Sequence, residues 1–341
     1  MLRWRVYALV AVVCILFLWT TLQLHRNLPG NEFNPDDGVP PQRDKEDKDS
    51  FSACLLVMDD NHFLIEWLAY HHFVLPLRDV VIAVDPRSQT SPDSILARWK
   101  DRIHITKWTD EHYMNTTELA EAELYVKMKF KQTIAGNPNL VRHRARQRLM
   151  YYKCMRHFKS KGKSWVVLID TDEFLHVNYP TVAAWNLTAP TIQKEGSVLT
   201  FLKNELQNPG HNLSNPCVQI PRLRFGAMES ADDLIRRHVP SGFNAMQFQT
   251  LRWRKHAHTG NININKISKT MIDLSRVNDD DLKPVDSIHL PLRSLCKRRH
   301  RYIKSEGQLF LINHYLGSRE QYFYRNDARA GKERSEEVRG K

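Results

Sequence analysis

Apolar runs of strand length alternate with helical patterns along the first half of the chain. Residues 52–58 (SACLLVM) and 80–84 (VVIAV) are continuous apolar runs, typical of strands that are covered on both faces. Residues 63–73 (FLIEWLAYHHF) carry apolar side chains at helical spacing, and residues 91–93 (SPD) begin a helix that leads to a third strand at 102–106. This alternation predicts an α/β fold with a mostly parallel central sheet and right-handed crossovers.

The clearest pattern of a buried strand is at residues 165–169 (WVVLI), directly before residues 170–172 (DTD). A polar, helix-prone stretch at 109–130 and a basic helix from about 141 to 159 precede this strand. Ligands of open α/β sheets bind at the carboxyl ends of the strands, so we expect these acids to face a ligand. Further strands are predicted at 197–202, 217–225 and 246–253.

Both ends of the chain differ in composition from its middle. Residues 6–24 form an apolar run nearly long enough to span a bilayer, and Arg3 and Arg5 before it favour a cytosolic N-terminus. No small-residue cleavage pattern follows, so we favour a retained signal anchor over a cleaved signal peptide. The predicted parts are a cytosolic tail at 1–5, a transmembrane anchor at 6–24, a disordered stem at 25–50, a folded domain at 51–325 and a charged tail at 326–341.

The chain is strongly basic. Lys and Arg outnumber Asp and Glu by 50 to 38, which indicates an anionic partner such as nucleic acid, anionic lipid or a sugar nucleotide, unless the surface is simply solvated. No zinc-finger, helix-turn-helix or ribonucleoprotein-strand pattern accompanies the charge, so we predict no nucleic-acid partner. The absence of a G-x-S-x-G elbow and of a P-loop leaves acyl-hydrolase and ATPase assignments without anchor residues.

Glycosylation triplets and cysteines agree with a domain in the lumen of the secretory pathway. Three asparagines stand in N-x-Ser/Thr triplets, namely Asn115, Asn186 and Asn212. Of the five cysteines, Cys14 lies in the predicted anchor, and the other four allow three disulfide connectivities. Because Cys54 falls in a strand and Cys154 in a helix, both can be buried thiols, and the favoured bridge joins Cys217 to Cys296.

The acids after the strand at 165–169 have a specific chemistry available to them. Asp170 and Asp172 are close enough in sequence to share one hard divalent cation, which would bridge diphosphate oxygens and neutralise a leaving group. The alternative is a structural turn, in which one acid caps the chain, Glu173 is solvated and Phe174 fills the core.

Residues 165–175 (WVVLIDTDEFL) resemble the Asp-x-Asp strand of GT-A-fold glycosyltransferases, above all family 92 and neighbouring family 2-like enzymes. Residues 54–61 and 64–71 are similar to the first strand and the E-W-x-x-x-H helix of that family, although Asp59-Asp60-Asn61 replaces the usual Lys- or Arg-Asn-Glu. Further segments match in the family's order, covering roughly 52–325: 84–88 (VDPRS), Arg146-Gln147 with Cys154, Phe225-Gly226, and His314-Tyr315 with Ser318.

The resemblance implies a GT-A catalytic domain that transfers a hexose from a nucleoside-diphosphate sugar to a glycan or glycoconjugate acceptor, by a metal-assisted single displacement with inversion. It also implies a type II protein of the Golgi or endoplasmic reticulum membrane that uses Mn²⁺ or another divalent cation. Asp170, Asp172 and His314 would bind the metal, since imidazole suits Mn²⁺ better than Mg²⁺. Asp59, Asp85, Asp170 and Lys269 would contact the donor.

An inverting transfer also needs a carboxylate to deprotonate the acceptor hydroxyl. Glu229 and Asp232, with Asp233, follow Phe225-Gly226 and are the candidates. Diphosphate charge could be neutralised by Lys266 and Lys269, or by Arg252 and Arg254. Other possible functions are a catalytically inactive lumenal carbohydrate-binding or scaffold protein of the same fold, a nucleotide-sugar hydrolase and a metal-dependent phosphatase.

Overall fold

A computed structural model describes residues 50–130, 137–191, 196–206, 215–226, 237, 242, 248–256, 267–292, 294–296 and 305–317. All of them belong to one compact unit, Asp47–Lys341. None of the helices in these ranges is long and apolar enough to cross a membrane. The predicted anchor and C-terminal tail, and the predicted stem up to residue 49, lie outside the described residues.

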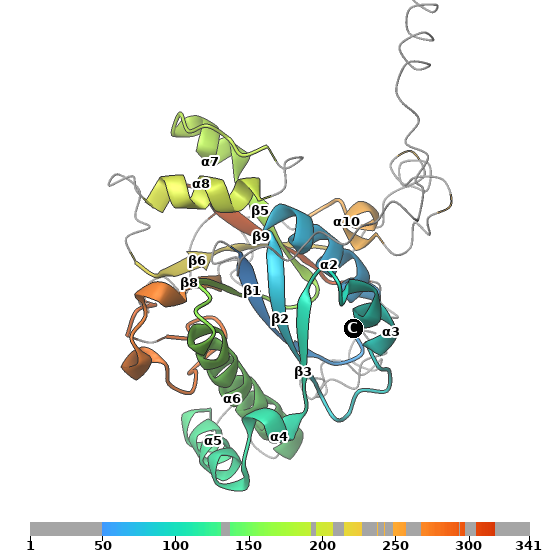
Figure 1. Cartoon of the computed structure of the whole chain (residues 1–341), viewed down its shortest axis with the longest axis vertical. Helices are drawn as coiled ribbons and strands as arrows, with labels where there is room; N and C mark the ends of the chain where they lie inside the picture. The colour runs from blue at the N-terminus through green and yellow to red at the C-terminus, as the bar shows by residue number, and fades with distance from the viewer. Residues whose placement is uncertain are drawn as a thin grey trace, which may run out of the picture. The chain divides into compact units, whose positions relative to one another are not determined.

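A six-stranded sheet forms the centre of the unit (Figure 1), with the strand order β3-β2-β1-β4-β8-β6. The first four strands run parallel, and β8 is antiparallel to both of its neighbours. This sheet confirms the prediction of a mostly parallel α/β architecture. The strands are β1 (Phe51–Val57), β2 (Leu77–Val84), β3 (His104–Trp108), β4 (Trp165–Leu168), β6 (Cys217–Ile220) and β8 (Lys269–Asp273).

Helices cover both faces of this sheet, which explains why β1, β2 and β4 read as continuous apolar runs. On one face, α2 (Asn61–Val74) buries Phe63, Trp67 and Leu68 in a core that includes side chains of β1. The other face carries α6 (Pro138–Ser160), which buries residues such as Leu149 and Met150 in a second core. α5 (Thr116–Lys129) packs against α6, and the short helices of this half are α3 (Asp93–Leu96), η1 (Ala97–Trp99) and α4 (Asp110–Tyr113).

A second sheet of three strands has the order β5-β9-β7. Its strands are β5 (Glu173–Val177), β7 (Arg222–Phe225) and β9 (Phe310–Tyr315), and β9 is antiparallel to β5 and parallel to β7. Because β4 ends at Leu168 and β5 begins at Glu173, the acidic turn between them joins the two sheets.

Two predicted strands are wrong. Residues 197–202 belong to α8 (Ser197–Leu206), whose buried Val198 and Leu202 stand four positions apart, and short apolar runs fit either structure. Residues 249–252 of the predicted strand at 246–253 form α10 (Gln249–Arg252). The remaining elements are α7 (Tyr179–Ala184) and the 3₁₀ turns η4 (Leu274–Arg276) and η5 (Asp279–Asp281).

Two disulfides link distant parts of the chain. Cys217 at the start of β6 is bonded to Cys296, with a Cα–Cα distance of 5.4 Å. Cys54 on β1 is bonded to Cys154 on α6, 6.1 Å apart, where two buried thiols were the alternative. The second bridge could not be derived from the sequence, because the two cysteines are 100 residues apart and the strand–helix contact that brings them together is tertiary.

Candidate active site

The order of the strands places a crevice beside β1. From β1 the chain moves outward through β2 and β3, then returns to β4 on the other side of β1. In open parallel sheets such a reversal is where ligands bind, because the segments after the two central strands diverge there. Residues 59–61 follow β1 and residues 170–172 follow β4, so both predicted acidic segments lie at this point.

Lys269, at the start of β8, lies between two of the acids. Its Nζ is 2.7 Å from Asp170 Oδ2 and 3.0 Å from Glu173 Oε2, and the side chain is 1% exposed. Burial lowers the pKa of Lys269, but the two carboxylates outweigh burial and raise that pKa above its usual value. The predicted donor-binding lysine therefore lies in the site as a buried counter-ion of the acidic turn.

Glu173 fixes the conformation of the turn at residues 170–172 through buried hydrogen bonds. It is fully buried, its Oε1 accepts from Arg222 Nη1 at 3.1 Å, and its Oε2 accepts from the backbone N–H of Asp170 at 2.9 Å. The Glu173 N–H in turn donates to the Asp170 carbonyl at 3.1 Å. The prediction of a solvated Glu173 is therefore wrong, since both of its carboxylate oxygens accept hydrogen bonds inside the protein.

Asp172, from the middle of the chain, and His314, from its last described strand, come together. The pairing of β5 with β9 sets His314 opposite Glu173, and the Tyr315 N–H donates to the Asp172 carbonyl at 2.8 Å. His314 Nε2 lies 3.5 Å from Asp172 Oδ2. Ligand atoms of Asp172, Glu173 and His314 all lie within 4.8 Å of one another, so among the described residues this group can hold a metal ion.

The Asp172–His314 pair fits a divalent ion. Two ligands about 2.1 Å from one ion, at a right angle, lie about 3 Å apart, and the observed separation is close to that and long for a hydrogen bond. His314 Nδ1 is buried without a hydrogen-bond partner among the described residues, and Glu173 Oε1 is 3.9 Å away. Histidines that bind metals usually donate the second ring N–H to a carboxylate, and Glu173 lies near His314 Nδ1 but beyond hydrogen-bond distance.

Of the three predicted metal ligands, the structure brings two together and pairs the third with a lysine. Asp172 and His314 are adjacent, whereas Asp170 Oδ2 is bonded to Lys269. Glu173, which was not a metal-ligand candidate from the sequence, is the third residue of the possible metal-binding group with Asp172 and His314. Its bonds to Lys269 and Arg222 indicate a positioning acid, and ligation by Asp170 stays a prediction.

The E-W-x-x-x-H helix positions the strand that follows the acidic turn. Trp67 Nε1 donates to the Glu173 carbonyl at 3.0 Å, and the Tyr70 hydroxyl donates to the Leu175 carbonyl at 2.6 Å. His71 Nδ1 donates to the Trp67 carbonyl at 2.9 Å and its Nε2 accepts from the Leu175 N–H at 3.3 Å. Burial lowers the pKa of His71 to about 3, so the ring is neutral as both bonds require.

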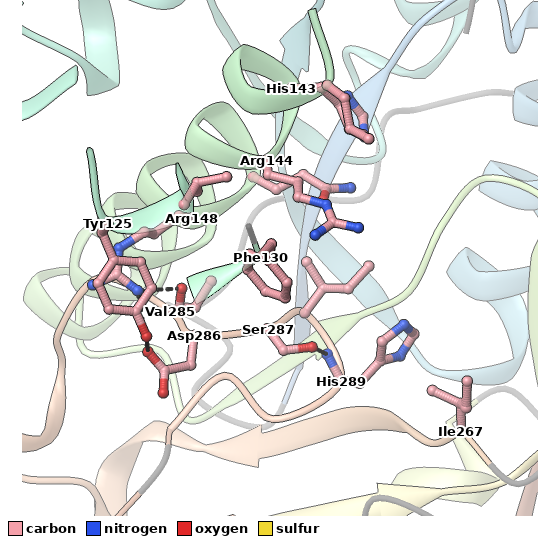
Figure 2. Close-up of a pocket in the computed structure, with 14 residues that line it drawn as sticks. Tyr125, Phe130, His143, Arg144, Arg148, Ile267, Val285, Asp286, Ser287 and His289 are labelled. Atoms are coloured by element: carbon pink, nitrogen blue, oxygen red, sulfur yellow. Dashed lines mark hydrogen bonds and ion pairs between the residues drawn. The ribbon is translucent and has the colours of Figure 1, made fainter. Parts of the chain in front are cut away.

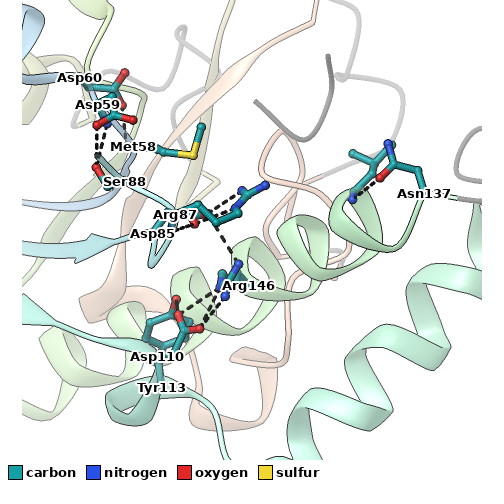
Figure 3. A network of polar contacts seen from close by, with 11 residues as sticks. Met58, Asp59, Asp60, Asp85, Arg87, Ser88, Asp110, Tyr113, Asn137 and Arg146 are labelled. Atoms are coloured by element: carbon teal, nitrogen blue, oxygen red, sulfur yellow. Dashed lines mark hydrogen bonds and ion pairs between the residues drawn. The ribbon is translucent and has the colours of Figure 1, made fainter. Parts of the chain in front are cut away.

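Asp85 belongs to a polar network at the ends of β2 and β3 (Figure 3). Its carboxylate accepts from Arg87 Nε at 2.9 Å and Nη2 at 2.8 Å, and Arg146 Nη1 is 3.7 Å away. Burial raises the pKa of Asp85, but Arg87 and Arg146 outweigh it and leave the pKa below its usual range. Arg146 on α6 also donates to Asp110 at 2.8 Å, so it links Asp85 to the segment that follows β3.

Asp59 joins the two loops after β1 and β2. Its Oδ1 accepts from Ser88 Oγ at 3.0 Å, from the N–H groups of residues 89 and 90 at 2.8 and 2.9 Å, and from Thr90 Oγ1 at 2.9 Å. The backbone of Asp59 has a φ of 56°, which is tolerated by a short polar side chain. These bonds make Asp59 a loop anchor, and its contact with a donor stays a prediction.

The predicted catalytic acids Glu229 and Asp232, with Asp233, lie outside the described residues, as do Lys266, Asn212 and Ser318. The described residues on either side of 227–247 are held near the site. Phe225 stacks on Tyr315 with ring centroids 4.9 Å apart, and Thr250 donates to Glu66 on α2. Burial raises the pKa of Glu66, with the Thr250 bonds opposing that shift.

Other predicted residues have plainer positions. Arg252 is buried, with its guanidinium 5.2 Å from the ring centroid of Trp253, and Arg254 is exposed. The glycosylation candidates Asn115 and Asn186 are both exposed. Asn115 also caps α5, because its side chain accepts from the Glu118 N–H.

Comparison with known proteins finds distant structural likeness. No protein-family model and no curated protein sequence matches the chain. The S. aureus protein TarS 1–349 is 12% identical with a TM-score of 0.33, over 81% of this chain and 62% of that one. Core-mannan synthase A (CmsA/Ktr4) from Aspergillus fumigatus, in a Mn/GDP form, is 12% identical with a TM-score of 0.28, over 69% of this chain and 62% of that one.

The mannosyltransferase Ktr4p from S. cerevisiae, in complex with GDP, is 11% identical with a TM-score of 0.28, over 75% of this chain and 63% of that one. The chain thus spans less than two thirds of the length of each of these proteins. Likeness at these identities and TM-scores carries no argument about fold family or activity. The case for a function rests on the residues of this chain.

Proposed function

We propose that the chain is a GT-A-fold glycosyltransferase that moves a hexose from a nucleoside-diphosphate sugar to a glycan or glycoconjugate acceptor. The observation that carries the proposal is the pairing of Asp172 with His314, 3.5 Å apart, in an acidic turn at the point where the strand order reverses. A nucleotide site is expected at that crevice in α/β sheets. The E-W-x-x-x-H and Asp-x-Asp-Glu-Phe segments, which resemble the family, meet there through Trp67 and Glu173.

Asp172 and His314 would hold the divalent cation, and Mn²⁺ suits a carboxylate with an imidazole. When bound, such an ion supplies charge stabilisation to the leaving diphosphate. The protein's own contribution is position. Lys269 and Arg222 neutralise Glu173, so the turn keeps its shape without a net buried charge at that residue. Asp85, with Arg87 and Arg146, would meet the nucleoside.

A single displacement with inversion also requires a general base that deprotonates the acceptor hydroxyl. Glu229 or Asp232 would take the proton of the acceptor hydroxyl as its oxygen attacks the anomeric carbon. The anchoring of Phe225 against Tyr315, and of Thr250 against Glu66, supports this choice, because both neighbouring segments are fixed beside the site.

The proposed location is the lumen of the Golgi or endoplasmic reticulum, with the apolar run at 6–24 as a type II anchor. Two disulfides favour an oxidising compartment, and the exposed triplets at Asn115 and Asn186 are accessible to glycosylation. A lumenal domain would have sugar nucleotides and glycans as partners, and no nucleic acid.

The decisive experiment is turnover of a donor panel by the purified full-length chain, with and without Mn²⁺. We expect transfer from one nucleoside-diphosphate hexose to an acceptor only with the metal present. Asp172→Asn should remove activity by a factor of about a hundred or more with unchanged thermal unfolding, because an ion held by fewer ligands stabilises the leaving group less. Asp93→Asn, in an exposed ion pair with Lys107, is the matched control and should keep full activity.

Three outcomes would contradict the proposal. Sugar release that is independent of any acceptor would identify a hydrolase. Donor or glycan binding without turnover would identify a binding protein. Full activity of Asp172→Asn would remove the metal role of the acidic turn.

A further inference from the structure

A pocket of about 260 Å³ lies between α5, the first half of α6 and the loop after β8 (Figure 2). Its walls include apolar and aromatic surface from Tyr125, Phe130 and Ile267, and polar groups from Arg144, Arg148 and His289. Pockets of this mixed kind, with apolar walls and a few polar groups, are typical of small-ligand sites.

One of the two arginines in the pocket, Arg148, already has an acid partner. Arg148 Nη1 donates to the Val285 carbonyl at 2.8 Å and lies 3.2 Å from Asp286 Oδ1, and its guanidinium stacks on Tyr125 at 3.8 Å. Asp286 also accepts from Tyr125 and pairs with Lys129 at 3.1 Å. The acid of the pocket is therefore already neutralised, and Arg148 serves to hold the loop at 285–286.

Among the described residues, Arg144 has no acid partner of this kind. Its guanidinium lies 4.3 Å from the ring centroid of Phe130, and its Nη1 is buried without a hydrogen-bond partner among the described residues. Burial lowers the pKa of Arg144, as expected for a guanidinium without a compensating acid. A guanidinium stacked on a ring keeps its N–H edge available for a planar or tetrahedral anion.

One wall of this pocket adjoins the acidic turn. His289 Nδ1 donates to the carbonyl of Ser268, and Ser268 precedes Lys269, the counter-ion of Asp170 and Glu173. Burial, together with Lys269 and Arg222, lowers the pKa of His289 to about 3, so this side chain is neutral and adds no charge. Arg144 is therefore the arginine of the pocket lining that has no acid partner among the described residues.

We propose that this pocket binds an anionic group of the acceptor glycan, a carboxylate, sulfate or phosphate, with Arg144 as its binding residue. The inference rests on the proposed function, because it names the acceptor class of that same site. The donor's diphosphate is the other possible source of an anion. It would have its cation at Asp172 and His314, whereas the aliphatic walls of this pocket, from Val126, Leu140 and Ile288, offer apolar surface to a sugar ring.

The test compares the binding of matched glycans to the full-length chain at physiological salt. Glucuronate-bearing, sulfated and phosphorylated oligosaccharides are each paired with the uncharged parent sugar. We expect one acidic class to bind at least tenfold more tightly than its parent. Arg144→Gln should remove that preference, since a hydrogen bond to a charged group is worth about tenfold or more. Arg156→Gln, an exposed arginine on the same helix, is the control and should change affinity less than twofold.

A second arm separates the acceptor from the donor. UDP and GDP with Mn²⁺ are titrated into the wild-type chain and Arg144→Gln, and we expect equal affinity within twofold. Weaker nucleotide binding in Arg144→Gln would assign the pocket to the donor and overturn the proposal. So would equal binding of charged and neutral glycans, or an acidic preference that survives in Arg144→Gln. Arg144→Lys, which keeps the charge, should retain part of the preference and tests the site if the Gln variant does not fold.

The two proposals fail in different ways. If the wild-type chain transfers no sugar from any donor, the glycosyltransferase proposal fails, and the comparison of acidic with neutral glycans still decides the role of Arg144. If transfer occurs equally well to charged and neutral acceptors, the enzyme stands and the acidic-acceptor inference falls.

Discussion

At the scale of single residues, the site depends on a balance of buried charge around Glu173. Its carboxylate is fully buried and has two cationic neighbours, Lys269 and Arg222. The sequence indicated Lys269 as a cation for the donor and gave no sign that it faces Glu173, because that contact joins β8 to the β4–β5 turn. Asp170 and Asp172 were found from their place after a buried strand, while the role of Glu173 required the fold.

Lys269→Met tests this balance. Removing one partner leaves a buried carboxylate with incomplete compensation, so the free energy of unfolding should fall by about 3 kcal/mol or more. Urea unfolding followed by tryptophan fluorescence measures the change. Lys153→Met breaks a half-exposed pair with Glu118 and should cost less than about 1 kcal/mol. Equal effects of the two variants would mean that Lys269 does not compensate buried charge.

At the scale of elements, the apolar pattern predicted the parallel strands of the core. It could not predict which strands pair when they are far apart in the sequence. β1, β2 and β4 are continuous apolar runs, so their burial was evident. The run at 197–202 was predicted as a strand and is helical. Its four apolar side chains fit both periods, so the pattern could not decide between the two. The β5–β9 pairing that brings His314 to Asp172 spans more than 130 residues of chain, and no local pattern specifies it.

His71 on α2 couples this element to pH. Its pKa is about 3 in the fold against an ordinary value near 6.5, so the folded state excludes a proton that the unfolded chain binds. The resulting stability is present above pH 6.5 and is lost as the pH falls toward 3. Between pH 7 and pH 5 we expect His71 to account for a loss of about 2 kcal/mol in the free energy of unfolding.

His71→Gln should remove this part of the pH dependence. The parts due to other groups should remain, such as His289, whose pKa is about 3, and His157 and His176, whose pKa values burial lowers. Denaturant unfolding at several pH values measures both slopes. Tyr70→Phe loses the neighbouring bond to the Leu175 carbonyl without removing the histidine, so it should lower stability at every pH and keep the wild-type slope. A wild-type slope in His71→Gln would contradict the buried neutral ring.

At the scale of the whole molecule, independent features agree on one compartment. An apolar N-terminal run, two disulfides joining residues 100 and 79 positions apart, and exposed glycosylation triplets have separate physical origins. Of these features, the disulfides are the ones that a reducing cytosol would disfavour. Their agreement is what supports a lumenal enzyme, since the basic net charge alone is equally consistent with nucleic acid.

Glycosylation in cells tests this placement without disturbing the fold. The expected result is that Thr117→Ala and Thr188→Ala each remove one glycan, seen as a single step in gel mobility, because the third residue of each triplet is needed for attachment. Thr117→Ala keeps Asn115 as the cap of α5, so a change in mobility reports the glycan and not the helix. Thr116→Ala leaves the triplet intact and should change nothing. If none of the three triplets, Asn212 included, carries a glycan although the chain is folded, the result contradicts the proposed lumenal location.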